Sequence, residues 1–159
     1  MYCIEHIVIV MEKGNQIKEA VEKSRALVER SNIAMLGTIG SDNFPHIKAM
    51  INAKHNDLRE IWFSTNTSSN RISQIKVNNK TSVYFVDFEA WEGLMLVGRM
   101  EIKRDKASRE MLWEDGCEHY YPLGIDDPDY SVLHFVAEYG SYYKSPVKVT
   151  FLIPENLDE

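Results

Sequence analysis

The sequence predicts a mainly β protein, a single domain whose strands form an antiparallel β-barrel with flanking helices. Three observations lead to this prediction. Short segments rich in β-branched and aromatic residues recur along the chain and are separated by turn residues. Helical periodicity occurs in only two or three stretches. The chain has 159 residues, 44% of them hydrophobic, and shows no repeat, linker or low-complexity tract, so one core is sufficient.

The first eleven residues are interpreted as an N-terminal extension. Their apolar run, residues 7–11, is too short to span a bilayer. Glu5 and His6 precede this run, where a secretory signal would carry Lys or Arg. Two alternatives stay open, because the extension is either an added edge strand or a segment upstream of a natural start at Met11.

An amphipathic helix is predicted over residues 16–30. Apolar residues recur at helical spacing on one face, while Lys and Glu occupy the other. The apolar face consists of Ile17, Ala20, Val21, Leu27 and Val28. We therefore expect this helix to pack against the core and to carry no chemistry.

Strands follow in succession. Residues 33–39 and 44–53 are predicted to form a hairpin around the turn at 40–43, and residues 59–64 form a third strand. The remaining strands are predicted over residues 81–88, 94–103, 132–137, 139–144 and 147–153. Gly98 marks a bulge or a close approach of two backbones.

The other segments are helical or irregular. Asp105 is expected to cap a helix that runs to Trp113, because a short acidic side chain accepts the first helical amides. Residues 120–130 form a loop punctuated by Pro and Gly.

The polar stretch after the third strand indicates an anion site. Three bulky apolar residues end the strand, six hydroxyl or amide residues follow, and Arg71 then precedes the apolar pair Ile72 and Ile75 of a short helix. Hydroxyls, free backbone N–H groups and a guanidinium at a helix start suit a phosphate monoester. The alternative is a capped turn, in which Ser68 or Ser69 satisfies the first helical amides.

Lys48 lies inside the second predicted strand, among apolar neighbours. Such a lysine either extends its ammonium group to water or meets an anion. The residues alone favour the first of these alternatives.

Composition narrows the classes of partner. The formal net charge of -6 and the pI near 5.4 disfavour broad attraction to nucleic acid or to an anionic membrane, so neither partner is expected. A local basic pocket is compatible with this charge. Cys3 and Cys117 are the only cysteines, which is no disulfide framework and fits a reducing cytosol, so we expect a cytoplasmic protein.

The order of motifs between residues 44 and 85 resembles the pyridoxamine 5'-phosphate oxidase-like FMN-binding split barrels. The matching segments are FPHIKAM, WFSTNTSSNRISQI and NNKTSVYF. The positions that carry the pattern are Pro45, Lys48, Phe63, Thr65, Asn66, Ser69, Arg71, Gln74 and Ile75. The later segments EGLMLVGRMEI, LGIDDPDYSVL and AEYGSYY look like the general stress protein branch. The resemblance runs from about residue 17 to residue 144 and favours the phosphate interpretation of the polar stretch.

This resemblance implies a Greek-key split barrel that binds FMN at the interface of a homodimer. Lys48 and Arg71 would hold the phosphate, helped by Ser69. Ser64 and Thr65 would line the phosphate and ribityl end. The isoalloxazine ring would lie along Ala49, Met50, Ile51 and Asn52, whose backbone amides face its polar edge.

The chain also departs from the true oxidases. These enzymes have a lysine where Ala53 stands and an additional arginine where Asn70 stands. They also need an Arg-x-His motif near the C-terminus, which is missing from residues 139–159. We therefore expect no oxidation of pyridoxamine phosphate.

Two classes of function remain open. The first is an FMN-dependent oxidoreductase that takes electrons from a reductant such as NAD(P)H and passes them to a small substrate. The second is a non-catalytic flavin-binding protein that acts as a store, sensor or scavenger in stress. A related barrel that binds haem or a deazaflavin is a more distant third. No catalytic side chain is identified by the sequence.

No metal site is predicted. The cluster Glu114, Asp115, Cys117, Glu118 and His119 lacks a second Cys/His pair from a separate element. The spacing of Asp126, Asp127 and Asp129 does not fit an EF-hand loop. Four tyrosines either wall a ligand pocket or serve packing, and the sequence favours neither role: Tyr120, Tyr121, Tyr142 and Tyr143.

Overall fold

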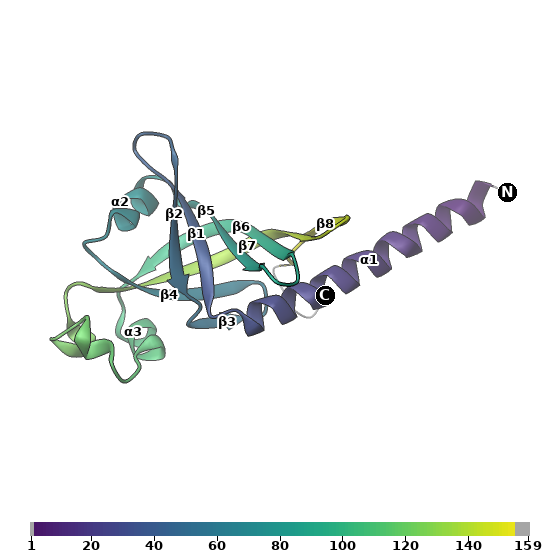
Figure 1. The fold of residues 1–159 in the computed structure, drawn as a ribbon. Helices are drawn as coiled ribbons and strands as arrows, with labels where there is room; N and C mark the ends of the chain where they lie inside the picture. Colours follow the sequence, from purple (N-terminus) through teal and green to yellow (C-terminus); the bar gives the residue numbers. More distant parts are fainter. Residues whose placement is uncertain (1, 155–159) are drawn as a thin grey trace.

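A computed structural model of the chain describes residues 2–154, with side chains described from Lys13 onward. In this part of the chain, eight strands form one curled antiparallel sheet, and helices lie outside it (Figure 1). The predicted fold class, an antiparallel split barrel with flanking helices, is confirmed.

The helices are α1 (Tyr2–Arg30), α2 (Asn70–Val77) and α3 (Lys106–Leu112), with short 3-10 turns at Cys117–His119 and Gly124–Asp126. The first four strands are β1 (Ile33–Ile39), β2 (Pro45–Ile51), β3 (Lys54–Asn56) and β4 (Glu60–Asn66). The last four are β5 (Lys80–Asp87), β6 (Glu92–Lys103), β7 (Tyr130–Lys144) and β8 (Val147–Leu152).

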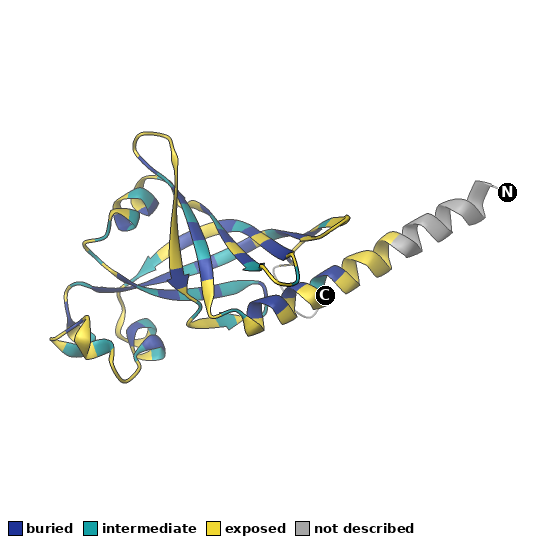
Figure 2. Cartoon of the chain, in the orientation of Figure 1, coloured by how far each residue is buried: buried dark blue, intermediate teal, exposed yellow. Residues whose placement is uncertain are grey.

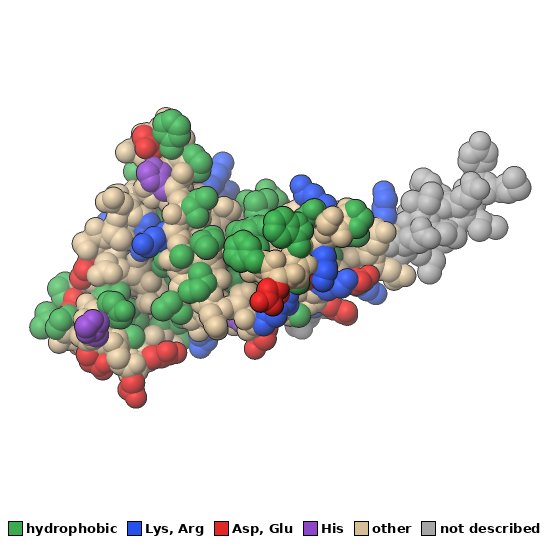
Figure 3. All heavy atoms as spheres, viewed as in Figure 1, with side chains coloured by type: hydrophobic (Ala, Val, Ile, Leu, Met, Phe, Trp, Pro, Cys, Tyr) green, Lys and Arg blue, Asp and Glu red, His purple; other side chains and the backbone are tan. Residues whose placement is uncertain are grey.

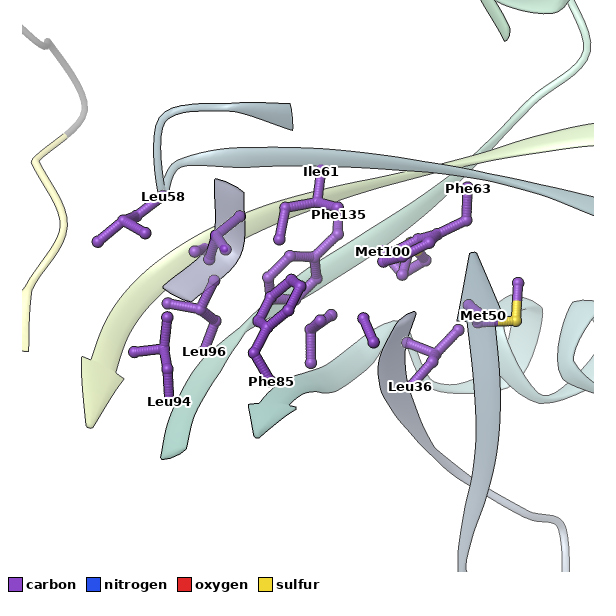
Figure 4. Packing of buried hydrophobic residues seen from close by; sticks show 14 of the residues in the cluster. Leu36, Met50, Leu58, Ile61, Phe63, Phe85, Leu94, Leu96, Met100 and Phe135 are labelled. Carbon is purple, nitrogen blue, oxygen red and sulfur yellow. The ribbon is translucent and has the colours of Figure 1, made fainter. Parts of the chain in front are cut away.

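The sheet order brings strands from distant parts of the sequence together. The order is β2-β1-β5-β6-β7-β4-β3, with β8 paired to β7, and the pairings are antiparallel. Thus β1 lies beside β5, and β4 lies beside β7. The inner side of the curled sheet holds the core, in which Leu36, Phe63, Phe85, Met100 and Phe135 pack together (Figure 4). Burial of these large side chains stabilises the fold by about 1.5–3 kcal/mol each.

The last long strand differs from the prediction. Residues 132–137 and 139–144 were expected as two strands, but β7 is a single strand of 15 residues. Val97 pairs with Tyr139 and Gly98 pairs with Ala137, so Glu138 is the extra residue of a β-bulge. A Cβ atom on Gly98 would lie 2.0 Å from the Val136 carbonyl oxygen, which confirms the predicted close approach.

The first helix is longer than predicted. It was expected over residues 16–30, but it begins at Tyr2 and is continuous to Arg30, so an edge strand within residues 1–11 is wrong. Figure 1 shows that α1 projects beyond the sheet. A bidentate contact holds its C-terminal half in place: Arg25 donates to Asp57 from Nε at 2.5 Å and from Nη2 at 2.8 Å.

The burial of side chains along α1 shows which part of the helix packs against the sheet. In the part of α1 whose side chains are described, from Lys13 onward, the first buried residue is Ala20, while Ile17 is 40% exposed (Figure 2). Within the described residues, no helix combines the length and the apolarity that a membrane span requires.

Candidate functional site

A group of polar side chains that we call the cationic corner lies where β4 leads into α2, beside β2. It consists of Lys48, Thr65, Ser69 and Arg71. On β4, Ile61, Phe63 and Thr65 are buried. Because successive side chains of a strand point to opposite faces, Ser64 points away from Thr65. The structure therefore does not bring Ser64 together with the corner.

The guanidinium of Arg71 connects the corner. Its Nη1 donates a hydrogen bond to the Thr65 hydroxyl oxygen. The Thr65 hydroxyl in turn lies 3.4 Å from the Ser69 hydroxyl. Ser69 is the N-cap residue of α2, but its side chain makes no capping hydrogen bond. The capped-turn alternative is therefore wrong for Ser69, whose hydroxyl is oriented toward Thr65 instead.

The charge of Arg71 is not balanced by an acidic side chain in the described part of the chain. Arg71 is half-buried, and this burial lowers its pKa from the usual value. Its neighbour Tyr121 is also affected by burial, which together with Asp129 raises the tyrosine pKa to about 12. A partly desolvated cation without a carboxylate favours an anionic ligand, because such a ligand replaces the lost hydration.

Lys48 faces the same space as Arg71. The two side chains line one hollow of about 250 Å³ between β2 and α2, together with Leu36, Thr38, His46, Ile47, Asn70 and Gln74. Lys48 is exposed, so its ammonium group is free to move within this hollow. The fold thus brings to one hollow the two cations that the family resemblance paired, whereas the residues alone favoured a Lys48 that extends to water.

His46 belongs to this hollow as well, although we did not assign it a role from the sequence. It precedes Lys48 by two residues, and the period of a strand places the two side chains on one face. Its Nε2 lies 3.2 Å from the Asp42 carboxylate. Strand spacing from Lys48 is the signal that would have found it.

The remaining polar residues of the stretch form hydrogen bonds with the loop before β7 or with the start of that strand. Asp129 accepts hydrogen bonds from the Asn66 amide at 2.7 Å and from the Ser68 backbone N–H at 2.7 Å. The Thr67 hydroxyl lies 2.6 Å from that of Ser131. These contacts shape the turn that places Ser69 and the start of α2.

The edge of β2 offers backbone donors. β2 is the terminal strand of the sheet, and the Asn52 N–H donates to the Asn32 carbonyl on the β1 side at 2.9 Å. In an antiparallel pair the amides alternate between the two edges. The N–H groups of Ile47, Ala49 and Ile51 therefore point to the free edge, where the resemblance implied an isoalloxazine ring.

Two of the residues that were expected to contact the flavin ring have side chains that point elsewhere. Met50 is buried in the core (Figure 4). The Asn52 amide donates to the carbonyls of Val28 and Ser31, at 2.9 Å each, and so closes the end of α1. The N–H groups of both residues also point toward β1, so in this segment the N–H groups of Ala49 and Ile51 are the ones that face the free edge.

An apolar surface that we call the outer sheet face lies next to this edge. Across the strands, Met35 pairs with Ala49 on one side and with Tyr84 on the other, and Tyr84 pairs with Met95. Figure 3 shows hydrophobic side chains gathered over β1, β2 and the β5–β6 hairpin. A hollow of about 470 Å³ on this face is lined by Met35, Tyr84, Val86, Asp87, Phe88, Trp91, Glu92, Gly93 and Tyr143. An exposed apolar surface of this kind is a candidate contact site.

Of the four tyrosines, two serve packing, one lines a hollow and one is exposed. Tyr121 packs against Tyr130 at a ring distance of 4.6 Å, and Tyr142 is buried with its hydroxyl donating to Glu92 at 2.6 Å. Tyr120 is exposed, whereas Tyr143 lines the hollow of the outer sheet face. Within the described residues, no group of three or more potential metal ligands comes together.

The sequence matches the family model described as pyridoxamine 5'-phosphate oxidase like over residues 19–155. Among solved structures, a protein related to general stress protein 26, of the pyridoxinephosphate oxidase family, from Clostridium acetobutylicum is 53% identical. The match covers 85% of this chain and 95% of that chain, with a TM-score of 0.78. No match was found among proteins of curated function.

More distant structures share the fold. General stress protein 26 from Bacillus anthracis str. Sterne is 19% identical, with a TM-score of 0.67 over 85% of this chain and 98% of that chain. A heme binding protein from Mycobacterium smegmatis is 16% identical, with a TM-score of 0.67 over 84% of this chain and 57% of that chain. At these identities the likeness concerns the fold alone.

Proposed function

The chain belongs to the pyridoxamine 5'-phosphate oxidase-like family, and from this premise we propose that it binds FMN at the cationic corner. The observation that carries the proposal is Arg71, a half-buried cation that faces a hollow shared with Lys48. Two charge-assisted contacts to a phosphate contribute about 3–6 kcal/mol, a large part of the about 8 kcal/mol of a micromolar affinity.

The donor set of the corner fits a phosphate monoester. Arg71 and Lys48 supply charge, the Ser69 hydroxyl is free of a capping role, and the start of α2 supplies backbone N–H groups. From this anchor the flavin ring follows β2, where the N–H groups of Ala49 and Ile51 meet its polar edge. Bound FMN supplies hydride and electron transfer, and the chain's own residues hold and orient it.

A second copy of the chain completes the site in this proposal. On β2, Ile47 is 73% and Ile51 is 70% exposed, so a ring on this strand is open to water in one copy. The adjoining outer sheet face is apolar and has the character of a protein interface. A homodimer that buries this face also covers the ring. Light scattering at micromolar concentration tests this point, and a monomer would contradict it.

The proposed activity is an oxidoreductase with a small substrate, distinct from a pyridoxamine phosphate oxidase. Asn70 lines the hollow as a neutral residue where the oxidases have arginine. A phosphorylated substrate therefore finds less positive charge here than in the oxidases. The alternative is that the protein binds flavin without turnover, as a store, sensor or scavenger.

Two measurements test the proposal. The visible absorption spectrum of the freshly purified protein is expected to show a flavin, and a haem spectrum or no chromophore after incubation with FMN would overturn it. Oxidation of NAD(P)H by the holoprotein, under air and with added acceptors, then separates the enzyme from the store. If the holoprotein oxidises NAD(P)H no faster than free FMN does, the protein has the non-catalytic role.

A further inference from the structure

A second hollow continues from the cationic corner. It has a volume of about 470 Å³ and is lined by Gly40, Ser41, Asp42, His46, Asn70, Ser73, Gln74 and Val77. His46, Asn70 and Gln74 line the hollow of the corner as well. The two spaces therefore adjoin and form one groove between the β1–β2 hairpin and α2. We call the part beyond the corner the distal hollow.

One face of α2 forms a wall of this groove. Ile72 and Ile75 point into the core. The groove residues Asn70, Ser73, Gln74 and Val77 have the i, i+3, i+4, i+7 spacing of a separate helix face. Lys76 belongs to neither set. This helix therefore presents a continuous side to a ligand, from the corner to the tip of the hairpin.

The chemistry changes along the groove. Both cations, Lys48 and Arg71, stand at the corner, and no Lys or Arg lines the distal hollow. The distal hollow offers neutral hydrogen-bonding groups and one carboxylate, Asp42. Gln74 accepts from the Thr38 hydroxyl at 2.7 Å through Oε1, which leaves its amide N–H groups for a ligand.

The direction of the proposed flavin leaves the distal hollow free. Its ring follows β2 from Lys48 toward Ile51, whereas the distal hollow begins at His46, on the other side of Lys48. A ligand that enters the distal hollow from the corner is thus attached to the far side of the phosphate. A phosphate monoester does not reach this space, but a flavin pyrophosphate that carries a second ester group does.

We propose that the distal hollow binds the adenylate half of FAD, with the pyrophosphate at the corner. This inference rests on the proposed flavin function. The order of groups along the groove matches the order in the dinucleotide: cations for the phosphates, then a carboxylate, the group that typically recognises ribose hydroxyls. The size of the distal hollow lies within the about 300–1,000 Å³ of small-molecule sites.

Titration of the full-length protein, freed of flavin, with FMN and with FAD tests the proposal. We expect FAD to bind about tenfold more tightly than FMN, because the adenylate adds contacts along α2. If FMN binds and FAD binds equally or more weakly, the adenylate site is refuted and the proposed function stands. If neither flavin binds, the proposed function itself fails.

A pair of variants tests whether the adenylate of FAD lies in the distal hollow. Ser73→Trp places an indole in the distal hollow and is expected to weaken FAD about tenfold while FMN affinity changes less than about twofold. Lys76→Trp adds the same bulk on α2 outside the groove and is expected to change neither affinity. Retained FMN binding shows that Ser73→Trp is folded. Equal FAD affinities of the two variants would overturn the proposal.

A third titration, of the FMN-loaded protein with AMP, identifies the source of the adenylate. We expect AMP to bind at least about tenfold more weakly than FAD, because the covalent link in FAD holds the adenylate at the groove. AMP that binds as tightly as FAD would assign the hollow to a separate nucleotide and would overturn the assignment to FAD.

Discussion

Two groups of similar side chains lie within one turn and have opposite roles. Asn66 and Ser68 are both bound to Asp129, across the gap between the turn and the loop before β7. Thr65, Ser69 and Arg71 contact one another, and no carboxylate of the described residues joins them. The first group holds the turn in shape, whereas Arg71 of the second group lines a hollow.

The difference teaches that a run of hydroxyl and amide residues does not by itself define a binding site. What separates the two groups is a partner distant in sequence, Asp129, whose carboxylate accepts from one group and does not reach the other. A half-buried charge costs free energy unless it finds a partner of opposite charge. Arg71, which has no carboxylate partner among the described residues, is therefore the candidate for function.

Removing the guanidinium is expected to have the largest effect on binding. Arg71→Ala should lower FMN affinity about tenfold or more, because one charge-assisted contact is worth about 1.5–3 kcal/mol. The free energy of unfolding should fall by no more than about 1 kcal/mol, since this cation has no carboxylate partner and loses one hydrogen bond, to Thr65. Flavin titration and urea unfolding measure the two effects.

Arg71→Lys is the matched variant for this change. It keeps the positive charge but lacks the planar fork that reaches both Thr65 and a phosphate. Its FMN affinity should lie between those of the wild type and Arg71→Ala. An Arg71→Ala protein with undiminished FMN affinity would show that the corner is not the phosphate site.

Asp129→Asn should produce the opposite pattern, with lower stability and a smaller change in FMN affinity than Arg71→Ala. The variant weakens the hydrogen bonds from Asn66 and Ser68 that shape the turn. Asp126→Asn is a suitable control, because Asp126 is exposed and lies in the same loop. Thermal unfolding with and without FMN measures both properties. A larger loss of FMN affinity than in Arg71→Ala would show that the two groups are not separable.

The stability that Asp129 contributes should depend on pH. Hydrogen bonds from Asn66 and Ser68 hold the pKa of Asp129 below its usual 3.8. A carboxyl group whose pKa is lowered on folding stabilises the protein above its unfolded pKa and loses this contribution as pH falls through the folded pKa. The urea midpoints of the wild type and Asp129→Asn should thus differ at about pH 6 and converge toward about pH 2. A difference that stays constant with pH would contradict this account.

The sequence was informative where local rules govern the structure. Apolar segments bounded by turn residues predicted most strands, and Asp105 caps α3 as expected, accepting from the Ser108 N–H at 2.9 Å. The close approach at Gly98 was also predicted, because a glycine within a strand has few other reasons to occur. Lys48 and Arg71 were paired through the family resemblance, and the fold brings both to one hollow.

Non-local contacts account for what the sequence did not predict. β3 has three residues and exists through its pairing with β4, which no local pattern signals. The continuity of β7 depends on a bulge at Glu138, the residue left out between the two expected strands. Asn52 lies at the end of β2, but its side chain bonds to the end of α1. The way in which Asp129 divides the polar turn into two groups also depends on contacts between residues that are distant in sequence.

Ser69→Ala is expected to have the smallest effect and separates the two roles of a single residue. A serine whose side chain caps a helix typically contributes about 1 kcal/mol, but the Ser69 hydroxyl makes no capping bond and faces Thr65. The free energy of unfolding should therefore change by less than about 0.5 kcal/mol, whereas FMN affinity should fall about threefold through the loss of one hydrogen bond from an uncharged hydroxyl. Asp105→Ala, which removes a side chain that does cap α3, is the matched control and should lower stability without altering FMN affinity. If Ser69→Ala instead lowers stability and leaves FMN affinity unchanged, Ser69 is part of the turn and not of the corner.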